Sequence, residues 1–191
     1  MDWVRERSRN GGADPVPLPR VGGGLWLCGK HFVGPDVEEA LRKTGATTAV
    51  CLNQRRELAD RYPEYLEWLA ANEPARAVWF PVPDLHAPTV EQALPFVEGL
   101  VTRVTAGEVL LLHCGAGIGR AGTLAAALLV RLGASLEEAV RAVASSRPMA
   151  GPEAGPQRDF LEAFARDRSR ASDAASTKAA PTTKGPSPRR V

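Results

Sequence analysis

Few cysteines, few histidines and no long hydrophobic run mark this chain of 191 residues. Its three cysteines, Cys28, Cys51 and Cys114, contain no C-x-x-C pair, which argues against a disulfide framework. The three histidines are scattered, so we expect no structural metal, and nothing indicates a cofactor. The apolar stretch 121–130 is about half as long as a membrane span, and no secretory signal follows Met1. These absences predict a cytoplasmic protein without a membrane partner.

A strong charge of either sign is also missing. The formal net charge of +2 gives no reason to expect nucleic acid as a partner, and we expect a monomer. Hydrophobic residues make up 44% of the chain, enough for a sizeable core. The two ends differ: residues 1–20 are rich in charge, glycine and proline, and residues 169–191 have no leucine or aromatic residue. We therefore predict a flexible arm over 1–20, one folded domain over 21–168 and a disordered tail over 169–191.

Strand-like and helix-like segments alternate along the predicted domain. Short apolar or β-branched runs predict buried strands at 25–28, 47–52, 77–83 and 109–112. Amphipathic or Ala/Leu-rich segments predict helices at 37–43, 58–71, 89–105, 121–132, 136–146 and 157–166. This alternation predicts an α/β fold in which a central, mostly parallel sheet carries helices on both faces.

The most informative stretch joins the strand at 109–112 to the helix that follows it. Its sequence is His113-Cys114-Gly115-Ala116-Gly117-Ile118-Gly119-Arg120. The glycines let successive backbone N–H groups turn inward, and the helix start adds partial positive charge, so the loop predicts an anion site. The planar guanidinium of Arg120 can hold two oxygens of a phosphate. The same field favours the thiolate of Cys114, which we expect to be a nucleophile beneath a bound phosphate.

This motif, HCGAGIGR, resembles the signature loop of the cysteine-based protein tyrosine phosphatases. The small size of the chain is similar to their dual-specificity branch, and the resemblance covers roughly residues 22–168. It implies the fold of that family and hydrolysis of phosphate monoesters, in which Cys114 attacks phosphorus and water cleaves the phosphocysteine. It also implies inhibition by phosphate-like oxyanions. The implied phosphate-binding residues are Gly115, Ala116, Gly117, Ile118, Gly119 and Arg120.

The resemblance implies further roles outside the loop. In the family, the histidine at the position of His113 supports the nucleophile; a buried core histidine is the alternative. The general acid of the family is an Asp on an upstream loop, and Asp84 in PVPDLHAP matches it, with His86 as a weaker candidate. A Gln near the start of the last helix positions water in related phosphatases, and Gln157 fits that pattern.

Two departures from the family pattern concern turnover and substrate. The family has Ser or Thr directly after the arginine, whose hydroxyl donates to the sulfur as the thiolate leaves. Here that position is Ala121, and Thr123 should point elsewhere around the helix, which predicts a slow second step. The loop that deepens the pocket in phosphotyrosine-specific members is absent. We therefore predict phosphorylated proteins or peptides as substrates, with phosphotyrosine and also phosphoserine or phosphothreonine accepted.

Several alternatives stay open from the sequence. A phosphoinositide or RNA 5′-phosphatase would use the same fold, although no lysine lies within 114–120 to suit highly charged inositol phosphates. A phosphate-binding pseudophosphatase with low turnover is suggested by Ala121. A thiol redox protein would need a resolving cysteine, and Cys28 and Cys51 fit better as small core residues. Arg55 and Arg56, after the strand at 47–52, could line a pocket for acidic substrate or belong to a solvated loop.

Overall fold

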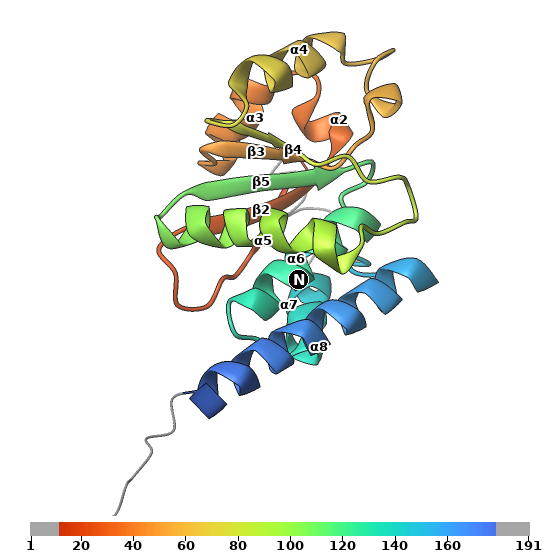
Figure 1. Ribbon diagram of the computed structural model, residues 1–191. Coiled ribbons are helices and arrows are strands. Elements are labelled where there is room, and N and C mark those ends of the chain that lie inside the picture. Colours follow the sequence, from red (N-terminus) through yellow and green to blue (C-terminus); the bar gives the residue numbers. More distant parts are fainter. Residues whose placement is uncertain (1–11, 179–191) are drawn as a thin grey trace, which may run out of the picture.

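The computed structural model describes residues 12–178 and contains a five-stranded sheet within that range (Figure 1). The strand order is β1-β2-β5-β3-β4. The central strand β5 (Val109–Cys114) is parallel to β2 (Gly24–Gly29) on one side and to β3 (Thr48–Cys51) on the other, and β4 (Ala77–Trp79) is parallel to β3. Only the edge strand β1 (Asp14–Val16) runs antiparallel. The predicted α/β fold with a mostly parallel sheet is confirmed.

Helices cover both faces of this sheet (Figure 1). One face carries α2 (Lys30–Val33), α3 (Val37–Thr44) and α4 (Pro63–Asn72), and the other carries α5 (Val90–Thr105), α6 (Gly119–Arg131), α7 (Leu136–Ser146) and α8 (Gly155–Lys178). Successive residues of a strand point to opposite faces. In β5, Leu110 and Leu112 therefore join the core under α5–α8, whereas Leu111 joins the core under α2–α4. None of the helices described is long and apolar enough to span a bilayer.

Helix starts follow the signals in the sequence. Asp36 begins α3 by accepting a hydrogen bond from the Glu39 backbone N–H at 2.9 Å. Reciprocal capping boxes begin α5 at Thr89 and α7 at Ser135. Pro63 begins α4 at a position where its missing N–H costs nothing, and the single turn η1 (Arg55–Glu57) precedes that helix. The predicted strand at 77–83 ends at Trp79, because the prolines after it cannot donate to a ladder.

The ends of the domain differ from the prediction of a flexible arm and a disordered tail. Asp14–Val16 forms an edge strand rather than part of an arm, and an ion pair joins the buried Asp14 to the buried Arg147. At the other end, α8 continues past residue 168 to Lys178, because neither glycine nor proline interrupts the sequence over 157–178. The rest of the predicted arm and tail, residues 1–11 and 179–191, lies outside the described residues.

Candidate active site

The carboxyl ends of the parallel strands meet at one edge of the sheet, on the right in Figure 1. Cys114 ends β5 there, the loop 115–118 follows, and α6 begins at Gly119. Gly117 has φ +74°, and a Cβ on it would lie only 2.2 Å from the carbonyl oxygen of Cys28. A Cβ on Gly119 would lie 2.1 Å from the Glu153 carboxylate. These glycines therefore let the loop curl tightly between β2 and the start of α8.

Arg120 is fixed in the first turn of α6 with its side chain buried. Its Nη1 donates to Glu57 Oε2 and to the carbonyl oxygen of Val82, both at 2.8 Å, and its Nη2 donates to Glu57 Oε1 at 2.8 Å. This bidentate pair sets the plane of the guanidinium. The Nε–H is also buried and has no partner among the residues described, so one donor of the guanidinium is unused.

Glu57 is the site residue that sequence reasoning missed. Partial burial acts to raise the pKa of its carboxyl, but hydrogen bonds from Arg120 and from the Gln54 backbone N–H lower it to about 2. Glu57 is therefore ionised at neutral pH. Its signal in the sequence was its place just after β3, where ligands collect in parallel sheets. The neighbouring Arg55 and Arg56 are exposed instead.

His113 faces away from Cys114, into the layer between the sheet and α4. Its Nε2 lies 2.6 Å from the hydroxyl of Tyr65, and burial lowers its pKa to about 3, so the imidazole is neutral at pH 7. Cys28 and Cys51 are the register partners of His113 on the adjacent strands and so point to its side of the sheet. All three cysteines of the chain are free thiols, and the sheet separates these two from Cys114.

The loop after β4 brings Asp84 to the same guanidinium. Asp84 Oδ1 lies 3.1 Å from Arg120 Nη2, and the Asp84 side chain is 71% exposed. The hydrogen bond from Arg120 to the Val82 carbonyl also connects this loop to the site. His86, the weaker acid candidate, is exposed, and its Nδ1 lies 2.7 Å from the carbonyl oxygen of Asp84. Cys114 and Asp84 therefore both lie within electrostatic reach of the Arg120 guanidinium.

Gln157 is buried at the first turn of α8, beside Gly119. Its Oε1 accepts from the Glu153 backbone N–H at 2.8 Å, and its Nε2 donates to the carbonyl oxygen of His86 at 3.3 Å. The Thr123 hydroxyl also donates to Gln157 Oε1, at 3.5 Å. Gln157 therefore joins the Asp84 loop, the start of α8 and α6. The Thr123 hydroxyl is directed to Gln157 rather than to the nucleophile.

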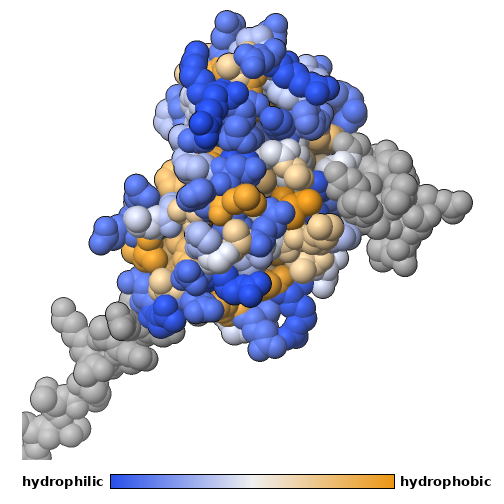
Figure 2. Space-filling model, turned by 90° about the vertical axis from the view of Figure 1, so that its right-hand side faces the viewer, coloured by the Kyte–Doolittle hydropathy of each residue, from blue (hydrophilic) through white to orange (hydrophobic). Residues whose placement is uncertain are grey.

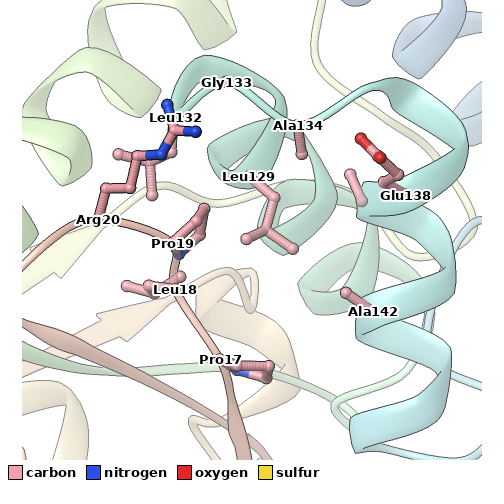
Figure 3. Close-up of a pocket in the computed structure, with 11 residues that line it drawn as sticks. Pro17, Leu18, Pro19, Arg20, Leu129, Leu132, Gly133, Ala134, Glu138 and Ala142 are labelled. Carbon is pink, nitrogen blue, oxygen red and sulfur yellow. The ribbon is translucent and has the colours of Figure 1, made fainter.

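A hollow of about 480 Å³ lies elsewhere, between Pro17–Arg20 and the junction of α6 with α7 (Figure 3). Leu18 and Leu129 line it, and Glu138 lies at its side (Figure 3). None of the residues predicted for the site contributes to this hollow. The catalytic geometry is therefore confined to the carboxyl edge of the sheet.

Comparison with known proteins assigns this geometry to a class. The family model described as Swiss Army Knife protein, DSP-PTPase phosphatase domain, matches residues 30–183. The chain therefore belongs to the cysteine-based dual-specificity phosphatases and is an enzyme of that class. The human protein dual specificity phosphatase 28 is 33% identical to it over 156 residues, covering 78% of this chain and 80% of the human one.

Solved structures agree with this class. Kinase associated phosphatase, crystallised with its catalytic-site cysteine replaced by serine, has a TM-score of 0.70 and 26% identity, covering 84% of this chain and 96% of its own. The active form of Tk-PTP has a TM-score of 0.61 and 27% identity, covering 78% of this chain and 97% of its own. The predicted family and its fold are therefore confirmed.

Proposed function

We propose that this enzyme hydrolyses phosphotyrosine, and also phosphoserine and phosphothreonine, in proteins and peptides through a phosphocysteine intermediate. The observation that carries the proposal is the guanidinium of Arg120, which Glu57 holds in place and whose buried Nε–H has no partner within residues 12–178. A phosphoryl group above Cys114 receives that donor together with the inward N–H groups of the loop. Such donors, fixed before substrate arrives, stabilise charge on the transferring oxygens.

The first step joins Cys114 Sγ to phosphorus and breaks the bond between phosphorus and the leaving oxygen. Asp84, next to the Arg120 guanidinium, protonates that oxygen, so that a neutral alcohol or phenol leaves. In the second step water attacks phosphorus, the sulfur–phosphorus bond breaks, and the Asp84 carboxylate takes the proton of the water. Gln157, held beside Gly119, is the residue that we propose positions this water.

The relatives bear on the substrate, and the proposed chemistry bears on the compartment. Kinase associated phosphatase and dual specificity phosphatase 28, the named relatives, are by their names phosphatases of the same class. PTPMT1, solved in complex with PI(5)P, shares the fold at 20% identity, so a phosphoinositide is a necessary arm of any test. The mechanism needs a reduced thiol at Cys114, which agrees with action in the cytoplasm.

The test is a phosphate-release panel with the full chain. Phosphotyrosine, phosphoserine and phosphothreonine peptides, phosphoinositide vesicles and RNA with a 5′-phosphate are compared by kcat/KM, and acid-quenched enzyme is examined by mass spectrometry for phosphocysteine. We expect release from the peptides and a phosphate adduct on Cys114. Cys114→Ser should lose all of the activity, whereas Cys51→Ser, a matched thiol on the other side of the sheet, should keep it. Release from vesicles or RNA alone would contradict the proposed substrate, and release without an adduct would contradict the mechanism.

A further inference from the structure

Two large apolar side chains are exposed among the residues described, and both border the catalytic edge. Leu85 is 53% exposed and Met149 is 79% exposed. Both have positive φ, +59° and +69°, a conformation that side-chain-bearing residues adopt at a cost. Figure 2 looks onto this edge and shows apolar surface in the middle of the face, with hydrophilic surface around it. Two large apolar side chains are therefore exposed to solvent beside the site instead of being packed in the core.

Met149 lines a hollow of about 450 Å³ that shares its lining with the phosphate loop. Gly115, Ala116 and Ile118 of the loop 115–118 line the hollow, so it adjoins the loop that we propose binds the phosphoryl group. Phe32 on α2 and Pro148 next to Met149 supply further apolar surface. A substrate whose phosphate sits over Cys114 can therefore place a neighbouring group in this hollow.

The charged groups of the hollow are already neutralised. The side chain of Arg147 is 1% exposed, and it forms an ion pair with Asp14. Its Nη1 also donates to the carbonyl oxygen of Gly12, and its Nη2 donates to that of Ala116 at 2.8 Å. The remaining donor, Nε, is buried and has no partner among the described residues, but the charge of the guanidinium is already balanced by Asp14. A second phosphate or a carboxylate would therefore meet a cation that already has its counter-charge.

His31, at the side of the hollow, is neutral too. Burial, together with the charges of Arg61 and Lys30, lowers the pKa of its imidazole. Its Nδ1 is engaged with the Tyr62 hydroxyl at 2.5 Å. Apart from the ion-paired Arg147, the side chains that line the hollow are apolar or uncharged at neutral pH, which suits an apolar ligand.

We propose that this hollow is a specificity subsite that binds a large apolar side chain next to the phosphorylated residue of the substrate peptide. The inference rests on the proposed protein phosphatase function. The volume lies within the range of roughly 300–1,000 Å³ that ligand sites occupy. Met149 suits the wall of such a subsite, because its flexible thioether adapts to aromatic and aliphatic partners. The peptide thus fixes its register by two anchors, the phosphate and one apolar neighbour.

The experiment uses matched phosphotyrosine peptides that differ in one neighbour of the phosphorylated residue, with Phe, Ser or Glu placed at each of the two positions on either side. We expect the enzyme to prefer Phe over Ser at one of these positions by about tenfold in kcat/KM. Met149→Ser should remove most of that preference and leave hydrolysis of p-nitrophenyl phosphate unchanged. Leu18→Ser, which removes an apolar side chain from the distant hollow of Figure 3, is the matched control and should keep the preference.

The possible outcomes separate the two proposals. Peptide hydrolysis with no preference, or with a preference for Glu, overturns the subsite and leaves the protein phosphatase function standing. Hydrolysis of p-nitrophenyl phosphate without hydrolysis of any peptide overturns that function and the subsite with it. If Met149→Ser lowers hydrolysis on phosphoinositide vesicles but not on the peptides, Met149 contacts the membrane rather than the peptide, and the subsite is overturned. Binding of the same peptides to Cys114→Ser should show the Phe preference in Kd, independently of turnover.

Discussion

At the scale of single residues, the pair between Glu57 and Arg120 decides the geometry of the site. Glu57→Gln keeps the size of the side chain but leaves the buried guanidinium of Arg120 with only the exposed Asp84 as a counter-charge. We expect a loss of about 2–4 kcal/mol in the free energy of unfolding and a fall in kcat/KM of about 10- to 100-fold. Urea unfolding and steady-state kinetics measure both. Glu64→Gln, an exposed carboxylate on α4, is the control and should change neither. An unchanged kcat/KM in Glu57→Gln would remove its positioning role.

His113 makes the stability of the enzyme depend on pH. Its pKa is about 3 in the folded chain and 6.5 ordinarily, so below pH 6.5 protons bind the unfolded chain preferentially. Stability is therefore complete above about pH 6.5 and falls by up to about 1.4 kcal/mol per pH unit as the pH is lowered toward 3. Unfolding in urea at pH 7 and pH 5 should show this fall in the parent and a flatter profile in His113→Gln. Equal profiles would contradict it. Glu57 adds a similar fall only below pH 4.5, its ordinary value.

We expect Ala121 to limit the second chemical step. Ala121 is buried in α6 and has no hydroxyl, and the nearby Thr123 hydroxyl is directed to Gln157. Neither side chain therefore donates a hydrogen bond to the departing thiolate. Ala121→Ser should raise the steady-state rate several-fold and shrink the pre-steady-state burst, because the phosphocysteine then breaks down faster. Stopped-flow hydrolysis of an aryl phosphate measures both. The absence of a burst in the parent enzyme would show that the first step is already limiting.

Some residues of this site could be predicted from the sequence, and others could not. Cys114 and Arg120 belong to one contiguous loop, so their spacing alone predicts an anion site. Asp84 needed the resemblance to a family, because a lone loop aspartate has no pattern of its own. Glu57 was missed because its partner Arg120 is 63 residues away in sequence. Only the adjacency of β3 and β5 in the sheet brings the two together.

At the scale of elements, a distant ion pair helps to anchor β1, which also pairs with β2. Asp14 and Arg147 are 133 residues apart, and Arg147 also holds the Ala116 carbonyl of the phosphate loop. Asp14→Asn should cost about 3 kcal/mol of unfolding free energy, because it leaves a buried charge unpaired. Glu137→Gln is the control, since its pair with Arg141 is exposed and should contribute less than about 1 kcal/mol. Equal losses in the two variants would contradict the anchoring role of Asp14.

The elements that the sequence predicted well have local causes. The capping residues Thr89 and Ser135 and the period of the apolar residues determine α5 and α7 without help from the rest of the chain. The strand β1 has only three residues and no pattern, so a charge-rich, proline-rich segment predicted an arm. Its order comes from tertiary contacts, which no window of the sequence contains.

At the scale of the whole molecule, the parallel sheet gathers the ends of β2, β3, β4 and β5 along one edge. Each loop that leaves this edge supplies one part of the proposed site: the nucleophile Cys114, the Arg120 counter-charge Glu57, the acid Asp84 and the apolar hollow. Helices on both faces bury the sheet and leave this edge open (Figure 1). The sequence predicted a mostly parallel sheet but not the order of its strands, because nothing in it states which strands are neighbours.

The sheet also acts as a partition between thiols. An oxidant that converts Cys114 to a sulfenic acid leaves it facing α6, while Cys28 and Cys51 lie behind the strands. No second sulfur of the chain can then close a protective disulfide with it. Recovery from such damage must draw on small thiols from solution, so the enzyme would be only as durable as the reducing capacity of its surroundings.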